Sequence, residues 1–138
     1  MVGPHELDTL KAAYVEWGKR GRACIPMWRA MMADSFRLAS MDESAPGLSF
    51  AKDRQSADEA AAYLEGIFEQ WDMLHYTPEH YLAQGDHIAV FGTCAYRNKA
   101  TGKAAETRFA CLWRFKGGKA VELFDIFDSA RAVAAATP

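Results

Sequence analysis

The hydrophobic period of the chain changes near its middle, and this change constrains the fold more than any other feature. Up to Trp71, apolar side chains recur at three- and four-residue steps, the period of a helix packed along one face. From about His75 onward, the apolar runs are strand-like and are broken by short groups of turn-forming residues. We therefore expect an α+β fold in which two or three helices pack on a sheet.

Three helices are expected before the change of period. The first covers roughly residues 5–19 and ends at Gly21, since glycine tolerates the backbone conformation that follows a helix. The second has Pro26 in its first turn, where a missing N–H is harmless, and stops near Asp34. A loop is expected over roughly residues 42–55.

The third helix has the clearest start. Ser56 and Glu59 form a capping box, in which each side chain satisfies a backbone N–H at the first turn of a helix. The buried stripe of this helix is expected to run from Ala60 to Trp71.

Four long strands joined by hairpins are expected in the second half. The turns fall near residues 84–86, 98–102 and 116–119, and short connections make neighbouring strands antiparallel. A short final helix is expected to run to Val133, with a frayed tail from about residue 134. The 138 residues fit one domain, a curved antiparallel sheet packed with helices.

Charge and cysteine content exclude several classes of protein. The 16 Lys and Arg balance 18 Asp and Glu, so no broad positive field favours nucleic acid. Cys24, Cys94 and Cys111 lie far apart, which disfavours disulfides and zinc and fits the reducing cytoplasm. Without a signal peptide or an apolar run of ~18 residues, no membrane association is expected. No glycine-rich phosphate loop or metal-ligand spacing occurs, so no cofactor is expected.

Both faces of the expected sheet are apolar. An antiparallel sheet usually leaves one face in water, so two apolar faces call for helices on one side and a second subunit on the other. We expect a homodimer formed through the sheet. The alternative is a monomer in which helices at the sheet margins cover both faces.

The order of these elements resembles the nuclear transport factor 2-like superfamily, and within it the ketosteroid isomerase-like and SnoaL-like (polyketide cyclase-like) branch. The resemblance covers nearly the whole chain and is carried by residues 82–90, 99–103 and 108–123, with Tyr14 ahead of Gly21. It implies a cystatin-like α+β barrel, in which a cone-shaped sheet wraps around the helices and a hydrophobic cavity. Such cavities serve isomerases, cyclases, dehydratases and binders without catalytic activity.

The resemblance also implies which side chains line the cavity. One parity of each strand would face inward, namely Phe91, Thr93, Phe109, Cys111, Trp113, Leu123, Asp125 and Phe127. Asp125 is the one acid on this apolar stripe, and burial would raise its pKa into a range useful for proton transfer. The alternative is that Asp125 pairs with an Arg or His, or contacts water at the rim.

Tyr14 falls where ketosteroid isomerases have the tyrosine that donates a hydrogen bond to the enolate oxygen. The two acids of those isomerases are missing, because Ser40, with Asp42 two positions on, and Cys111 take their places. Proton transfer would therefore depend on Asp125. The alternative for Tyr14 is packing in the core, as for any aromatic residue on a helix stripe.

The remaining candidates are aromatic residues and histidines. The core is the expected place of the four tryptophans, and one or two of them are expected to present a flat apolar wall to a ligand; they are Trp17, Trp28, Trp71 and Trp113. His80 is a candidate for the cavity, although a surface role is also open; His75 is expected on the opposite strand face, which excludes a shared metal site.

Two functions follow from different classes. The first is a cofactor-independent isomerase, cyclase or dehydratase that acts on a small apolar carbonyl compound, with Asp125 moving the proton and Tyr14 stabilising the oxygen. The second is a binding or dimerisation module of the same fold without catalytic activity.

Overall fold

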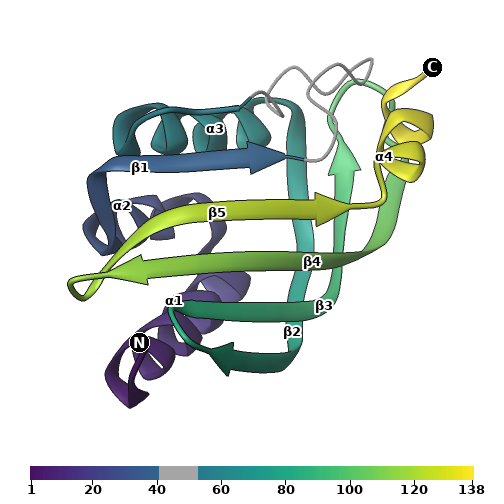
Figure 1. The fold of residues 1–138 in the computed structure, drawn as a ribbon. Coiled ribbons are helices and arrows are strands. Elements are labelled where there is room, and N and C mark those ends of the chain that lie inside the picture. Colours follow the sequence, from purple (N-terminus) through teal and green to yellow (C-terminus); the bar gives the residue numbers. More distant parts are fainter. Residues whose placement is uncertain (41–52) are drawn as a thin grey trace.

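The structure is a computed structural model that describes residues 1–40 and 53–138. Four α-helices, one short 3₁₀ helix and five strands make up this part of the chain (Figure 1). In chain order they are α1 (Pro4–Arg20), η1 (Gly21–Cys24), α2 (Ile25–Met31), β1 (Met32–Ser40), α3 (Ala57–Gln70), β2 (Trp71–Gln84), β3 (His87–Asn98), β4 (Ala104–Lys116), β5 (Lys119–Phe127) and α4 (Ser129–Ala136).

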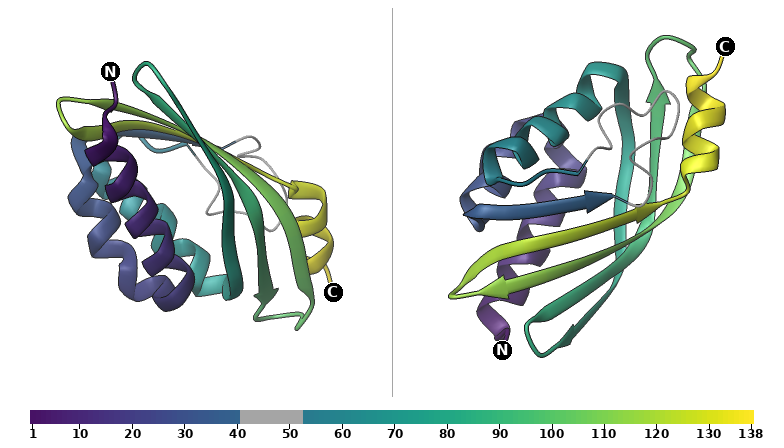
Figure 2. Two further views of the ribbon diagram at one scale, coloured as in Figure 1. Left: turned by 90° about the horizontal axis from the view of Figure 1, so that it is seen from below. Right: turned by 45° about the horizontal axis from the view of Figure 1, so that its top comes forward.

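The strands form one sheet in the order β1-β5-β4-β3-β2. Strands β2 to β5 pair antiparallel as a meander, as expected from the short turns between them. Strand β1 adds a parallel edge to β5, so the sheet is mixed rather than wholly antiparallel. The sheet is strongly curved but does not close into a barrel (Figure 2). The α+β class and the curved sheet are confirmed, and the parallel edge strand β1 is the one addition to the antiparallel sheet that was expected.

Strand β1 was not predicted. The second helix stops at Met31 and not near Asp34, and the chain continues as a strand in which buried Phe36 and Leu38 alternate with exposed neighbours. This alternation has the period of a strand, but it spans too few residues to outweigh the helix that precedes it. Of the loop expected over residues 42–55, only 53–55 lie among the described residues.

The third helix begins where its cap predicts. The Ser56 side chain accepts a hydrogen bond from the Glu59 backbone N–H at 3.1 Å, and the helix starts at Ala57. Its end differs from the expectation, because the helix stops at Gln70 and Trp71 is the first residue of β2. Trp71 is buried in the strand, as it was expected to be in the helix, so the apolar pattern did not distinguish the two conformations.

The final helix is longer than expected. Helix α4 continues past Val133 to Ala136, and the hydroxyl of Thr101 donates a hydrogen bond to the carbonyl of Ala135. Ala135 is buried, so the segment expected to fray packs against the hairpin that joins β3 and β4.

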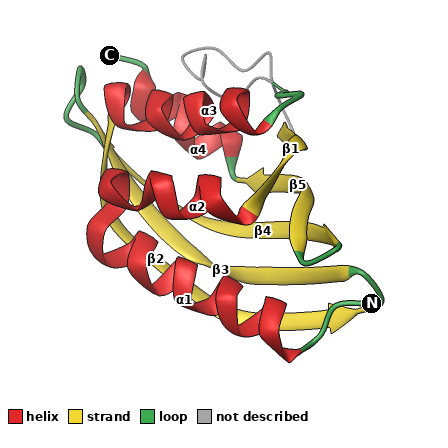
Figure 3. Cartoon of the chain, turned by 90° about the vertical axis from the view of Figure 1, so that its left-hand side faces the viewer, coloured by secondary structure: helices red, strands yellow, loops and turns green. Residues whose placement is uncertain are grey.

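Helices α1, α2 and α3 lie side by side on the concave face of the sheet (Figures 2 and 3). Strand β4 shows the division most clearly, since every second residue is buried against these helices; its inward residues are Ala105, Thr107, Phe109, Cys111, Trp113 and Phe115. The core therefore fills the space between one helix layer and one face of a curved sheet.

Candidate active site

A cavity of about 80 Å³ remains inside the curved sheet near α4. Side chains from α3, α4 and four strands line it: Tyr63, Ile67, Trp71, Tyr76, Cys94, Tyr96, Ala105, Thr107, Asp125, Phe127 and Ala132. Five of them are aromatic. Asp125 is the only charged side chain among these lining residues. The cavity is therefore an aromatic chamber with a single acid.

The carboxylate of Asp125 is held from two layers of the fold. The Tyr63 hydroxyl of α3 donates a hydrogen bond to Asp125 Oδ2 at 3.0 Å. The Cys111 thiol of β4, which is the cross-strand partner of Asp125, donates to Oδ1 at 3.3 Å. No salt bridge to Asp125 occurs within residues 1–40 and 53–138. The expectation of an acid on an apolar stripe is therefore met by the geometry.

Burial raises the pKa of Asp125, and the hydrogen bonds from Cys111 and Tyr63 offset part of this rise. Asp125 is partly buried, and it lines the cavity. An acid in this environment exchanges a proton closer to neutral pH than an exposed aspartate does.

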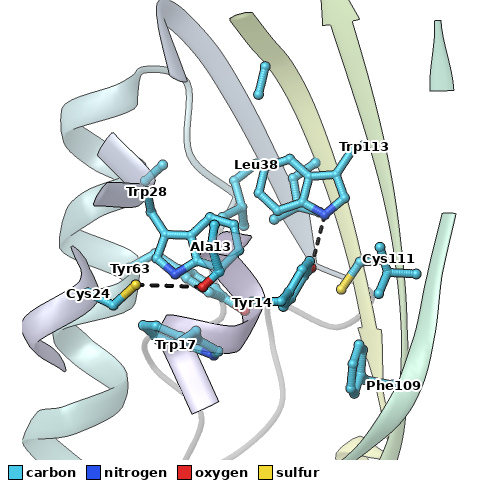
Figure 4. Packing of buried hydrophobic residues seen from close by; sticks show 14 of the residues in the cluster. Ala13, Tyr14, Trp17, Cys24, Trp28, Leu38, Tyr63, Phe109, Cys111 and Trp113 are labelled. Carbon is cyan, nitrogen blue, oxygen red and sulfur yellow. Dashed lines mark hydrogen bonds between the residues drawn. The ribbon is translucent and has the colours of Figure 1, made fainter. Parts of the chain in front are cut away.

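The opposite end of the interior is packed with aromatic rings (Figure 4). The Trp113 indole N–H donates a hydrogen bond to the Tyr14 hydroxyl at 2.9 Å. Trp28 stacks on Trp113 with ring centroids 5.4 Å apart, and Trp17 meets Trp28 edge to face. Burial raises the pKa of Tyr14 well above its usual value. Tyr14 does not line the cavity, and its hydroxyl lies beside the Cys111 thiol (Figure 4).

The structure separates the residues expected around a ligand. Asp125 and Phe127 line the cavity. Six others lie in the packed interior outside it: Trp17, Trp28, Phe109, Cys111, Trp113 and Leu123. Phe91, Thr93 and His80 face the other side of the sheet.

The expected parity of β3 is wrong. Its inward residues are Ile88, Val90 and Cys94, whereas Phe91 points away from the helices and is 42% exposed. Since both parities of β3 are apolar, the sequence left the register open, and a shift of one residue exchanges the two faces. Thr93 shares the outer face with Phe91 for the same reason.

The predicted arrangement of the histidines is also wrong. Strand β2 has an irregularity between Pro78 and His80, so His75 pairs with Ala95 while His80 pairs with Phe91. The extra residue places both histidines on the outer face, because a bulge reverses the alternation of side chains. His75 lies 3.7 Å from Glu106. No cluster of three or more metal-ligating side chains occurs in the part of the chain that the structure describes.

Three tyrosines of the cavity lining, Tyr63, Tyr76 and Tyr96, were not among the residues expected around a ligand, whereas Trp71 was one of the tryptophans considered for its walls. Tyr63 follows Ala60 by three residues on the predicted helix stripe, so the helical period was a usable signal for it. Tyr76 and Tyr96 depend on the strand registers, which the sequence did not determine.

Comparisons with known proteins agree with this fold. The sequence profile of the SnoaL-like domain family matches residues 12–123. No curated protein is significantly similar to the chain. Every helix among the described residues is too short or too polar to cross a bilayer.

Solved structures show the same architecture at low sequence identity. An NTF2-like protein of unknown function from Burkholderia pseudomallei has 24% identity and a TM-score of 0.85 over 99% of this chain and 100% of its own. A candidate SnoaL-like polyketide cyclase from Jannaschia sp. has 16% identity and a TM-score of 0.78, over 100% and 98% of the two chains.

A third structure, from Catenulispora acidiphila, has a ketosteroid isomerase-like fold and is in complex with trimethylamine. It has 12% identity and a TM-score of 0.74 over 99% of this chain and 100% of its own. The profile match spans most of the sequence, and the chain therefore belongs to the SnoaL-like domain family.

Proposed function

We propose that this protein is a cofactor-independent isomerase, cyclase or dehydratase that moves a proton on a small apolar carbonyl compound. One observation carries the proposal: the carboxylate of Asp125 lies in an aromatic cavity, hydrogen-bonded by Tyr63 and Cys111, without a salt bridge among the described residues. An acid in this setting suits proton transfer, because its two protonation states are closer in free energy than those of an exposed aspartate.

The reaction begins with ionised Asp125. The carboxylate takes a proton from the carbon next to the carbonyl group, and the electrons of the broken C–H bond move to the carbonyl oxygen as an enolate. The resulting carboxylic acid then returns this proton to another atom of the substrate. Tyr76 also lines the cavity, and in this scheme its hydroxyl donates a hydrogen bond to the enolate oxygen. Tyr14 does not contact the substrate in this scheme, because its hydroxyl lies beside the Cys111 thiol that donates to Asp125.

Proton exchange tests the proposal without knowledge of the natural substrate. We expect the protein to accelerate exchange of α-protons for deuterium in some members of a panel of small cyclic ketones and lactones, measured by proton NMR in D₂O. Asp125→Asn should remove the acceleration. Glu122→Gln is the matched control, because Glu122 is an acid on the same strand that pairs with Arg114 outside the cavity. Equal exchange rates for wild type and Asp125→Asn would refute the proposal.

A second candidate function is binding of a compact ammonium ion without catalysis. Five aromatic side chains and one carboxylate line the cavity, and aromatic faces with an acid attract cations. The Catenulispora structure, which shares only the fold, is a complex with trimethylamine. The cavity volume of about 80 Å³ favours a compact ligand.

Calorimetric titration with tetramethylammonium distinguishes the two candidates, with tert-butanol as an uncharged comparison. Binding of the cation should strengthen as the pH rises through the pKa of Asp125, since the carboxylate must be charged. Binding of tert-butanol should not follow the pH. If neither compound binds and proton exchange is accelerated, the first candidate stands alone.

We also propose that a second copy of the chain covers the outer face of the sheet. Exposed apolar side chains on this face, among them Phe91, Leu112, Phe124 and Ile126, are each more than 40% exposed. Neighbouring strands bring them together, and a patch of this kind is typical of a protein interface. Sedimentation at micromolar concentration should give twice the monomer mass, and Leu112→Glu should restore the monomer. A monomeric wild type would contradict this proposal.

The three cysteines are unpaired thiols, and this supports the further proposal of a cytoplasmic location. Fractionation of cells that produce the protein tests it.

A further inference from the structure

A series of polar side chains runs through the apolar interior from the packed end to the cavity. Trp113 donates to the Tyr14 hydroxyl at 2.9 Å, and this hydroxyl lies against the Cys111 thiol. Cys111 donates to one oxygen of Asp125, and Tyr63 donates to the other. Asp125 and its hydrogen-bond donor Tyr63 are the two members of this series that also line the cavity.

Tyr63 is built to hold this carboxylate in place. It is 2% exposed, and it reaches from α3 across the interior to β5, 62 positions away in sequence. The backbone of Asp125 is fixed by pairing of β5 with β4, but its side chain would otherwise be free to rotate. Tyr63 of the helix layer holds one carboxylate oxygen, and Cys111 of the sheet holds the other. These two hydrogen bonds fix the orientation of the carboxylate and stabilise its ionised form.

The two donors are unequal. A phenol is a strong donor to a carboxylate, whereas a thiol is a weak one, and hydrogen bonds to charged groups are among the strongest in proteins. Tyr63 therefore contributes most of the restraint on Asp125.

We propose that Tyr63 is the positioning residue of Asp125 in proton transfer, and that Tyr14 acts one step further back, through Cys111. The catalytic role of Tyr63 rests on the proposed function. The hydrogen bond from Tyr63 to Asp125, and its effect on the pKa of Asp125, do not. This proposal reassigns the role that the resemblance to ketosteroid isomerases implied for Tyr14.

Among the residues that the structure describes, other titratable groups near Asp125 come from α1, β2, β3 and β4. They are Tyr14, Tyr76, Cys94, Tyr96 and Cys111, and none is charged at neutral pH, because burial raises the pKa of each. Among the described residues, the pKa of Asp125 therefore depends on burial, which raises it, and on the two hydrogen bonds, which lower it, and not on a neighbouring charge.

The pKa of Asp125 measures the effect of the Tyr63 hydrogen bond directly. Carbon NMR of the labelled side-chain carboxyl group follows its ionisation without any substrate. Tyr63→Phe should lower the acid dissociation constant of Asp125 about tenfold, because the charged form loses its stronger donor. Tyr14→Phe should change it less. Tyr96→Phe is the matched control, since Tyr96 lines the same cavity while Asp125 has other hydrogen-bond donors.

A second variant retains the tyrosine ring and should change the pKa of Asp125 in the opposite direction. Replacement of Tyr63 by 3-fluorotyrosine makes the phenol a stronger donor and should raise the acid dissociation constant of Asp125. This measurement stands even if Tyr63→Phe fails to fold. A titration of Asp125 that is unchanged by fluorination, or changed equally by Tyr63→Phe and Tyr96→Phe, would overturn the inference.

Proton exchange then separates this inference from the proposed function. If both are correct, the midpoint of the pH profile of exchange moves to higher pH in Tyr63→Phe together with the NMR titration, and it stays in place in Tyr96→Phe. If the NMR titration moves but no compound exchanges, the proposed function fails while the restraint on Asp125 is real. If exchange requires Asp125 but its pH profile is the same in wild type and Tyr63→Phe, the positioning role of Tyr63 is refuted and the proposed function stands.

Discussion

The two ends of the interior are filled in different ways, although the same strands run through both. At the end near α2, the rings of Tyr14, Trp28 and Trp113 are in mutual contact and leave no space for a ligand. At the end near α4, strand β4 contributes the small side chains of Ala105 and Thr107, and a cavity remains. One end therefore stabilises the fold, and the other is available for chemistry.

Truncation of an aromatic side chain should separate the two ends most clearly. Trp113 is 2% exposed, and Trp113→Ala removes its ring contacts and its hydrogen bond to Tyr14. We expect a loss of about 3–5 kcal/mol in the free energy of unfolding, measured by urea denaturation. Phe127→Ala, in the half-buried cavity wall, should have a much smaller effect. Equal losses would show that the two ends do not differ in packing.

Gly92 lies where β2 and β3 approach each other closely between the two ends. A Cβ atom there would collide with the Thr77 carbonyl oxygen and would lie 2.8 Å from the Phe109 ring, where β2 bulges at Pro78. Gly92→Ala should reduce stability by about 2–3 kcal/mol, because this site has no room for another methyl group. Thr93→Ser, on the outer face, is the control, with a change within about 0.5 kcal/mol. A neutral Gly92→Ala in thermal unfolding would mean that β2 can move away.

Filling the cavity should affect binding more than stability. Ala132 of α4 lines the cavity, so Ala132→Leu places extra carbon atoms in the space that a ligand needs. We expect the affinity for whichever probe binds the wild type to fall about tenfold or more, a change of ~1.4 kcal/mol. Calorimetry gives the measurement. Ala134→Leu, on the exposed side of α4, should bind as the wild type does.

The smallest effect concerns the pH dependence of stability. Burial raises the pKa of Asp125 in the folded protein, so above the ordinary pKa of an aspartate, ~3.9, the folded state binds more protons than the unfolded state. The contribution of Asp125 to stability therefore falls as the pH rises and stays low above the folded-state pKa. Asp125→Asn should raise the Tm by a few degrees at pH 8 and by less at pH 4. A lower Tm at pH 8 would show that the charged form is stabilised by folding.

Local signals in the sequence were sufficient for much of the fold. The capping box at Ser56, the proline at the start of α2 and the three turns act through a few adjacent residues, and each is at its expected place. Strand β1 was missed because its partner β5 lies far along the chain. Pairing between distant segments leaves little trace in local periodicity.

The candidate site was less predictable for the same reason. Asp125 was recognised because an acid on an apolar stripe is a local anomaly. Tyr63, its partner, was not recognised, because their contact depends on how α3 lies across β5. The parity of β3 and the position of His80 depend on register and on one bulge in β2, which no pattern of apolar residues in these strands determines.

Strand β5 carries Asp125 between Phe124 and Ile126, whose side chains point to the opposite side of the sheet. One stretch of backbone thus serves both the chamber and the outer surface. A substitution that shifts the backbone of this strand therefore moves the acid of the cavity and the apolar outer surface together.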